Sequence, residues 1–253
     1  MKKIIKTVLI CLEVAVLFVV VGALTTAITK NVYADILIEQ FKSKAILAEE
    51  ESSSMVKVYK IPSDETLSCA QNNGFEYYPG NEGDILITLQ SELEIPFIHD
   101  FISFFAGGHA GLVLGNYADV DGKINDMYTV ESSGLNEDLN LADISSKMYW
   151  TVYKHPVIGL RVKMTEEERK TVVSRGMALI GDPYNYSFLF DVNNKAYCSD
   201  LVGKAFQSIG VNLNKDGFTT SVYDLLVSSE TYISYYQYLD SEGVKHIYYL
   251  DTK

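Results

Sequence analysis

The N-terminal apolar run is the feature that most restricts how this chain can fold. Three lysines within the first six residues precede an apolar segment from Thr7 to about Ile28. A basic start followed by a long apolar segment is typical of a secretory signal peptide or an N-terminal membrane anchor. The stretch Val32-Tyr33-Ala34 has the small-residue spacing of a cleavage site, so cleavage and retention are equally open. We expect residues 1–34 to direct export, which leaves the protein extracellular or anchored in the membrane and facing outside.

A polar segment follows at residues 35–55 and ends in the charge run Glu49-Glu50-Glu51-Ser52-Ser53-Ser54. Runs of this kind are typical of a solvated tether. The remaining residues, 56–253, are enough for one domain with a full core. With 47% hydrophobic and 21% charged residues, the composition is that of an ordinary globular protein. The net charge of −12 argues against nucleic acid as a partner.

One helix is predicted to begin at Cys198, because the apolar residues that follow recur with a period of 3.6. In the first turn of a helix, unpaired backbone N–H groups and the positive helix end favour a thiolate. A thiolate is the nucleophile of cysteine hydrolases, where a histidine base is held in place by a third polar group. The same position also suits a buried core cysteine, or a disulfide with Cys69, and the helix alone leaves these alternatives open.

The pattern around this helix predicts an α+β fold with an antiparallel sheet, against which the cysteine helix packs. Strands are predicted from alternation and apolar runs, and helices from a period of 3.6 residues or a capping box. The predicted strands cover residues 83–87, 109–115, 127–131, 150–154, 158–163, 233–238 and 244–250. The further helices cover residues 95–105, 139–146, 165–180 and 219–227.

Among the four histidines, His109 is the best candidate for the base. It opens a buried strand directly after Gly107-Gly108, where a strand fixes the ring and glycine leaves room for close approach. Glu131 ends the strand predicted to pair with it, and a carboxylate there can hold the imidazole in one tautomer. Each residue alone is commonly structural, but together they place three required residue types at the ends of neighbouring elements.

Five motifs taken together resemble a known enzyme family. They are Gly83-Asp84-Ile85-Leu86, Gly108-His109-Ala110-Gly111-Leu112-Val113, Val130-Glu131-Ser132, Pro183-Tyr184-Asn185 and Tyr197-Cys198-Ser199-Asp200-Leu201-Val202. The set resembles the circularly permuted papain-like enzymes, and more narrowly the YiiX/YebB-type branch of the NlpC/P60 superfamily. In ordinary NlpC/P60 enzymes the cysteine precedes the histidine, whereas the order here is histidine, acid, cysteine. The resemblance spans about residues 80–215, with Asp200 where such motifs often have glutamate.

The resemblance implies a permuted papain-like fold that uses no metal or other cofactor. Carried over by position, Cys198 is the nucleophile, His109 is the general base and acid, and Glu131 orients the imidazole. The implied reaction is cleavage of an amide (peptide) bond through an acyl-enzyme, with cell-wall peptidoglycan as the substrate that the wider superfamily suggests. Tyr184 and Tyr197 are candidates to donate a hydroxyl hydrogen bond to the substrate oxyanion, although buried packing is the more ordinary role for a tyrosine.

Three other functions remain open at this point. Because the domain is acidic, a lipid-linked amide or ester, hydrolysed or used for acyl transfer at the membrane, competes with a polyanionic wall polymer. A non-catalytic module on the same fold would use the groove only to hold a peptide or a lipid. A purely structural, membrane-anchored surface protein is the third possibility. The state of the Cys198 thiol separates the last two alternatives from an enzyme.

Overall fold

The computed structural model describes residues 2–64, 79–91, 96–118, 124–134, 141–145, 150, 156–188, 194–215 and 219–252. Its helices are α1 (Lys2–Lys42), α2 (Pro96–Phe105), α3 (Glu166–Met177), α4 (Cys198–Gln207) and α5 (Val222–Val227), with a 3-10 helix η1 (Glu49–Glu51). Its strands are β1 (Ile46–Leu47), β2 (Val56–Ser63), β3 (Ile85–Thr88), β4 (His109–Ala118), β5 (Ile124–Ser132), β6 (Ala142–Ser145), β7 (Val157–Val162), β8 (Thr231–Leu239) and β9 (Lys245–Thr252). Most predicted elements are confirmed, while the strand predicted over 150–154 lies outside the described residues apart from Trp150.

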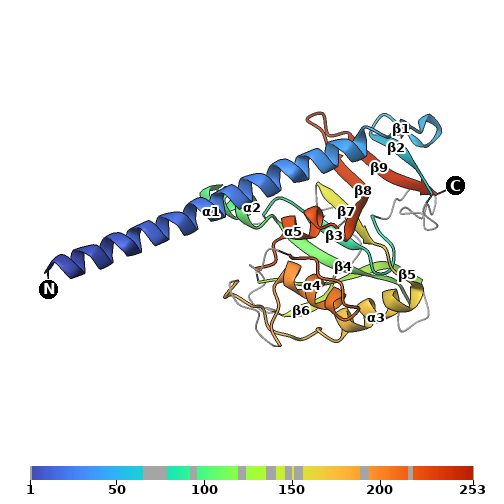
Figure 1. Cartoon of the computed structure of the whole chain (residues 1–253). Coiled ribbons are helices and arrows are strands. Elements are labelled where there is room, and N and C mark those ends of the chain that lie inside the picture. The colour runs from blue at the N-terminus through green and yellow to red at the C-terminus, as the bar shows by residue number, and fades with distance from the viewer. Residues whose placement is uncertain are drawn as a thin grey trace.

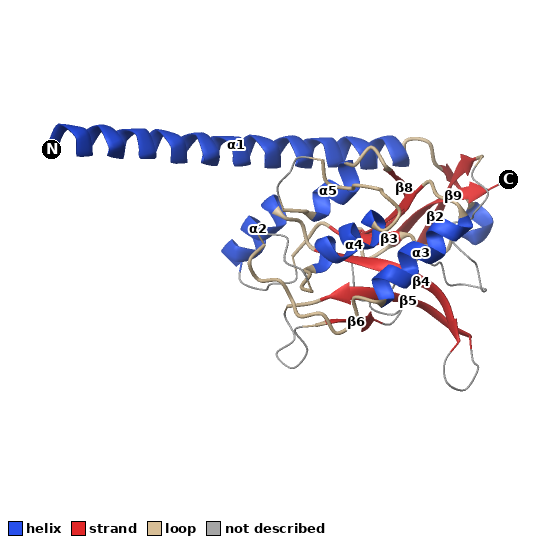
Figure 2. Cartoon of the chain, turned by 60° about the horizontal axis from the view of Figure 1, so that its bottom comes forward, coloured by secondary structure: helices blue, strands red, loops and turns tan. Residues whose placement is uncertain are grey.

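The described strands form one sheet in the order β1-β2-β9-β8-β7-β3-β4-β5-β6. Neighbouring strands pair antiparallel except β2 and β9, which run parallel. Helices α3, α4, α5 and the second half of α1 pack side by side along this sheet, as Figure 2 shows. The expected α+β class with a mainly antiparallel sheet is therefore confirmed.

One predicted helix is wrong. Residues 142–145, inside the helix expected over 139–146, form strand β6, which pairs antiparallel with β5. Ala142 is buried and Asp143 is exposed, which is the alternation of a strand. The hydrogen-bonding edge of β5 decides the outcome, because this short polar segment lacks an apolar stripe wide enough to hold a helix on the core.

Helix α1 has two halves with different surroundings. Its N-terminal half projects beyond the domain, and its apolar side chains from Ile5 to Leu24 are exposed (Figure 1). Its C-terminal half packs on α2, α5 and β8 through one stripe. The buried members of that stripe recur at intervals of three, four or seven residues and are Ala27, Ala34, Ile38 and Phe41.

The segment predicted to be a solvated tether is therefore packed against the domain. Residues 35–42 continue α1, β1 pairs with β2, and η1 is held by an ion pair between Glu51 and Lys60. The charged and polar residues of α1 hid the apolar stripe, because only every third or fourth residue of α1 needs to be apolar on the side that faces the core. The division of the chain at residues 34 and 55 remains a prediction.

The tyrosine-rich C-terminal region supplies the surface on which α1 ends. Strands β8 and β9 carry Tyr238 and His246, whose rings stack with centroids 4.7 Å apart. Tyr59 of β2 continues the stack on the other side of His246, at 6.0 Å. The ammonium group of Lys42, the last residue of α1, lies over the Tyr238 ring at 5.6 Å from its centroid. These strands thus fasten the helix to the sheet.

Candidate active site

Helix α4 places Cys198 at its first position. The preceding Tyr197 has the extended backbone of an N-cap residue, and its side chain makes no capping hydrogen bond. Cys198 carries a free thiol that is only 8% exposed, while Cys69 lies outside the described residues. The predicted apolar stripe is confirmed, because the residues that anchor α4 in the core are Leu201, Val202, Ala205 and Phe206.

His109 is the first residue of β4, and the glycine before it allows this position. A Cβ on Gly108 would lie 2.0 Å from the carbonyl oxygen of Gln90, so no other residue fits there without moving the backbone. The His109 ring is 7% exposed, and its Nε2 lies 2.7 Å from Oε2 of Glu131. His109 also hydrogen bonds to Cys198, which leaves Nδ1 as the nitrogen that faces the thiol.

Glu131 reaches His109 from β5, where it pairs in register with Gly111 of β4. A Cβ on Gly111 would lie 2.9 Å from Cγ of Glu131 and 3.2 Å from the ring of Trp150, so glycine makes room for both side chains. Thr129, two residues earlier on the same face of β5, donates its hydroxyl hydrogen bond to Oε1 of Glu131. The carboxylate is 4% exposed and is therefore held inside the protein by several donors.

Trp150 completes this arrangement. Its indole N–H donates to Oε1 of Glu131 at 2.5 Å, and its ring stacks on His109 with 15° between the planes. The side chain is fully buried, and the backbone carbonyl of Trp150 accepts a hydrogen bond of 3.2 Å from the amide of Gln237. Glu131 thus has a fixed orientation towards the imidazole.

The electrostatics of the three groups favour a charged pair of sulfur and imidazole. Burial alone lowers the pKa of His109, but hydrogen bonds with Cys198 and Glu131 outweigh it and raise the pKa to about 10. Burial alone raises the pKa of Cys198, yet the net shift is downwards. It is lowered by the hydrogen bond and charge of His109 and by backbone hydrogen bonds from Ala110 and Ser199. The geometry therefore supports a thiolate beside a protonated imidazole.

The two candidate tyrosines have different partners. The Tyr197 hydroxyl shares a hydrogen bond with the hydroxyl of Thr219. The pKa of Tyr184 is raised, first by burial and then by the negative charge of the Cys198 thiolate. The Tyr184 ring contacts Phe188, whose ring in turn lies 5.4 Å from that of Tyr197.

The structure thus brings the three predicted side chains together: Glu131 is hydrogen bonded to His109, and His109 is hydrogen bonded to Cys198. Residues 81–229 match the family model of the permuted papain-like amidase enzymes, the YaeF/YiiX, C92 family. The chain belongs to this family. A search of curated proteins gives no match to the sequence. This C92 amidase is therefore a papain-like cysteine amidase or peptidase, and the resemblance inferred from the motifs is confirmed.

Sequence reasoning gave no role to two buried residues, Trp150 and Asp84. Trp150 gave no local signal beyond being the single tryptophan of the chain. Asp84, part of a quoted motif, is fully buried and accepts two hydrogen bonds from Arg161, at 2.8 and 2.7 Å. This ion pair joins the start of β3 to β7, and its position beside the turn at Gly83 explains the acidic residue in that motif.

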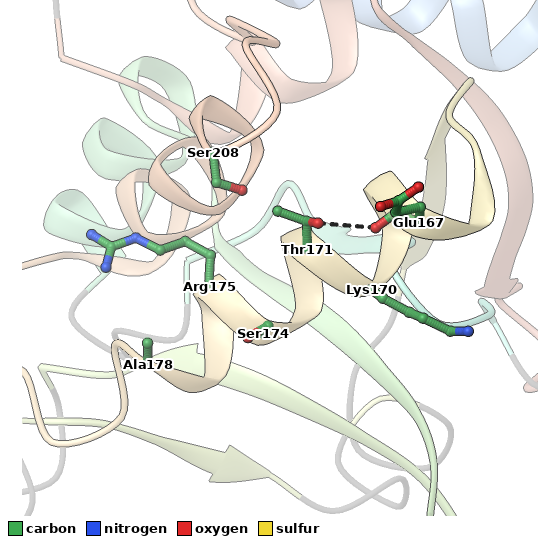
Figure 3. Close-up of a pocket in the computed structure, with 7 residues that line it drawn as sticks. All are labelled: Glu167, Lys170, Thr171, Ser174, Arg175, Ala178 and Ser208. Carbon is green, nitrogen blue, oxygen red and sulfur yellow. Dashed lines mark hydrogen bonds between the residues drawn. The ribbon is translucent and has the colours of Figure 1, made fainter.

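A separate hollow on the C92 amidase lies away from this chemistry. Figure 3 shows it along the outer side of α3, with Ser208 from the end of α4 at one edge. Its volume is about 500 Å³, and Glu167, Lys170 and Arg175 among its lining residues extend outward. The residues that line it do not include Cys198, His109 or Glu131. The hollow is a feature of the helix surface and does not border the thiol.

Proposed function

We propose that Cys198 is the nucleophile of this amidase, that His109 is its general base and acid, and that Glu131 orients His109. The observation that carries the proposal is the position of His109. Its Nε2 is hydrogen bonded to Glu131, and its other nitrogen is hydrogen bonded to Cys198. This is the arrangement that nucleophilic catalysis by a thiol requires. The family is one of amidases, which supports hydrolysis of an amide bond.

The proposed reaction proceeds in two halves. The Cys198 thiolate attacks the carbonyl carbon, a C–S bond forms, and the carbonyl electron pair moves to the oxygen. When the tetrahedral intermediate collapses, the C–N bond breaks and the proton of the His109 imidazolium passes to the leaving amine. Water then attacks the thioester while His109 accepts its proton, and the acid and the free thiolate are released. Glu131 stays ionised throughout and holds the Nε2 proton.

The oxyanion of both intermediates needs hydrogen-bond donors. We assign one donor to the backbone N–H of Cys198, in the first turn of α4, where N–H groups have no partner within the helix. Tyr184 is the better tyrosine candidate for a second donor, because the pKa of its hydroxyl is raised by burial and by the negative charge of Cys198. The hydroxyl of Tyr197 is already shared with Thr219, which favours a packing role.

The substrate is proposed to carry its amide bond outside the cell and near the membrane. The described residues contain one helix, Leu9–Lys42, long and apolar enough to cross a membrane. We propose that it acts as a retained anchor that leaves the domain on the exported side. A peptide amide of peptidoglycan fits such a position. A lipid-linked amide or ester, cleaved or used for acyl transfer, is favoured more by the net charge of −12, which repels polyanionic wall polymers.

The test measures the reactivity of Cys198 in the full chain carrying Cys11→Ser and Cys69→Ser, so that one thiol remains. The rate of iodoacetamide alkylation is followed against pH. We expect rapid labelling to persist well below the ordinary thiol pKa of about 8.5, and His109→Ala to move the profile back to that value. His246→Ala is the matched control, because His246 also pairs with a carboxylate, Asp240, at 2.9 Å. Slow labelling that His109→Ala leaves unchanged would refute the proposal and favour a non-catalytic module.

A further inference from the structure

Helix α2 exposes three large apolar side chains on one short helix. Phe97 is 80% exposed, Phe101 is 56% exposed, and Ile98 is 41% exposed. The same helix carries a polar pair, His99 and Asp100, whose side chains lie 3.0 Å apart at the surface. A helix with one apolar and one polar surface is suited to a boundary between water and an apolar phase. Large contiguous apolar groups on a protein surface indicate a partner.

The position of α2 identifies that partner. In both views α2 lies beside α1, near the point where α1 leaves the domain (Figures 1 and 2). The amide of Asn31 in α1 donates a hydrogen bond of 2.9 Å to the carbonyl of Phe104 in α2. Just before Asn31 the surroundings of α1 change, because Ala27 is the first buried residue of the stripe and Leu24 is exposed. The apolar surface of α2 therefore continues the exposed apolar surface of α1.

The length of the apolar part of α1 sets the level of the membrane surface. The segment from Thr7 to Ile28 is about 33 Å long as a helix, and the hydrocarbon core of a bilayer is about 30 Å thick. One boundary of the bilayer then crosses α1 close to Ile28, less than one turn from Asn31. Lys30, which follows, pairs with Asp224 of the domain and so belongs to the aqueous side. Helix α2 lies at the same level as this boundary.

We propose that α2 is a second membrane contact, which rests its exposed phenylalanines in the interfacial layer of the bilayer that α1 crosses. The occupant of this surface is lipid, because the apolar surface is continuous with that of the anchor and lies at its level. With two contacts, the domain has a fixed orientation on the membrane. Only three residues separate the end of α2 from His109, the first residue of β4, so this orientation holds the proposed site close to the lipid headgroups. The inference rests on a retained anchor and does not depend on the role of Cys198.

The test uses tryptophan fluorescence of the full chain reconstituted in phosphatidylcholine vesicles. Phe97→Trp and Phe101→Trp are prepared singly, while Trp150, which is fully buried, gives a constant background. Ile46→Trp is the control, because Ile46 is 63% exposed on β1, at the opposite end of the domain (Figure 1). We expect the two α2 variants to emit at shorter wavelength and to lose intensity about twofold when acyl chains are brominated, because α2 would lie at the headgroup and acyl boundary. The control should show neither change.

Two results would overturn the inference. One is emission from Phe97→Trp and Phe101→Trp that matches Ile46→Trp and is not quenched by brominated lipid. The other is a shift to shorter wavelength without quenching that depends on the ratio of protein to lipid, since this would place a second copy of the chain on α2. Alkylation of Cys198 in the same vesicles reports separately on the proposed chemistry, so failure of one proposal can be told from failure of the other.

Discussion

The indole of Trp150 stacks on the imidazole of His109, with ring centroids 5.8 Å apart, and its N–H ends on the carboxylate that His109 contacts. One side chain therefore shields the ring and orients its partner. A hydrogen bond to a buried charged group contributes about 1.5–3 kcal/mol. Trp150 is on this basis a positioning residue for the pair of His109 and Glu131.

Replacement of Trp150 separates these two contributions. Trp150→Phe keeps an aromatic ring on His109 and removes the donor to Glu131, so kcat should fall about tenfold with little change in KM. Trp150→Ala removes both the ring and the donor. The rate of Cys198 alkylation should then also vary less with pH. Kinetics on a cleaved amide substrate and the alkylation profile are measured for both variants. Equal, small losses in kcat with an unchanged pH profile would mean that Trp150 only fills space.

The pH dependence of stability follows from the pKa values of His109 and Cys198. In the unfolded chain the ordinary pKa is 6.5 for His109 and 9.0 for Cys198. Between these two pH values the unfolded pair therefore binds one proton, which is on the sulfur. The folded pair also binds one proton. This proton is on His109, because the pKa of His109 is raised and that of Cys198 is lowered. Above both pH 6.5 and the lowered pKa of Cys198, their contribution to the free energy of unfolding should therefore be level up to about pH 9.

Above this range the sign of the slope is fixed. At higher pH the folded pair keeps its proton longer, so stability is lost as pH rises towards about 10. Urea unfolding of the wild type is compared with Cys198→Ala/His109→Leu across this range. A contribution that does not fall as pH rises from about 9 towards 10 would contradict the raised pKa of His109.

Asp84 should contribute strongly to stability through its pair with Arg161. Asp84→Ala removes the carboxylate that pairs with the buried guanidinium, which costs about 3–5 kcal/mol. The control is Glu166→Ala, because Glu166 pairs with Lys170 in full contact with water and should leave the melting temperature essentially unchanged. Thermal unfolding in detergent measures both. Similar melting temperatures for the two variants would contradict a structural role for this motif residue.

The packing of α1 on the domain can be tested on two isoleucines of the same helix. Ile38 is 8% exposed on the buried stripe, whereas Ile36 is 44% exposed. Ile38→Ala should lower the free energy of unfolding by about 2–5 kcal/mol, the usual cost for a buried isoleucine. Ile36→Ala should change it by less than about 0.5 kcal/mol. If both substitutions are neutral, residues 35–42 are a tether as the charge pattern suggested.

Two tyrosine variants test the second oxyanion donor. Tyr184→Phe removes a hydroxyl close to Cys198 and should lower kcat about 10²-fold, as the loss of such a donor does in other enzymes. Tyr197→Phe removes a hydroxyl that is bonded to Thr219 and should change kcat little. Steady-state kinetics on one amide substrate compares them. Full activity of Tyr184→Phe would assign that side chain to packing and leave the backbone N–H of Cys198 as the donor.

What could be predicted from the sequence depended on how local the signal was. The 3.6 period after Cys198 and the capping box at Thr165 involve neighbouring residues, and both helices form as expected. The helix predicted over 139–146 was wrong because the edge of β5, supplied from elsewhere in the chain, decides the structure there.

Long-range contacts account for the remaining differences. Trp150 reaches the site only because the sheet brings it to Glu131, and no spacing in the sequence records that contact. The stripe on α1 was hidden because its buried residues are separated by charged and polar ones. The pairing of His109 with Glu131 could be predicted, since two adjacent strands joined by one connection place their ends together.

Helix α1 runs from Lys2 to Lys42 without a break, and its second half is part of the core. A chain held in this way has no hinge between the bilayer and the catalytic domain. With α1 inserted, the domain can rotate about the bilayer normal and diffuse sideways, but it cannot swing outward. The region in which it can contact a substrate is then a thin layer above the lipid, about one domain diameter deep. If α1 is a retained anchor as proposed, amide bonds in that layer are within reach of the enzyme, and bonds in the outer cell wall are not.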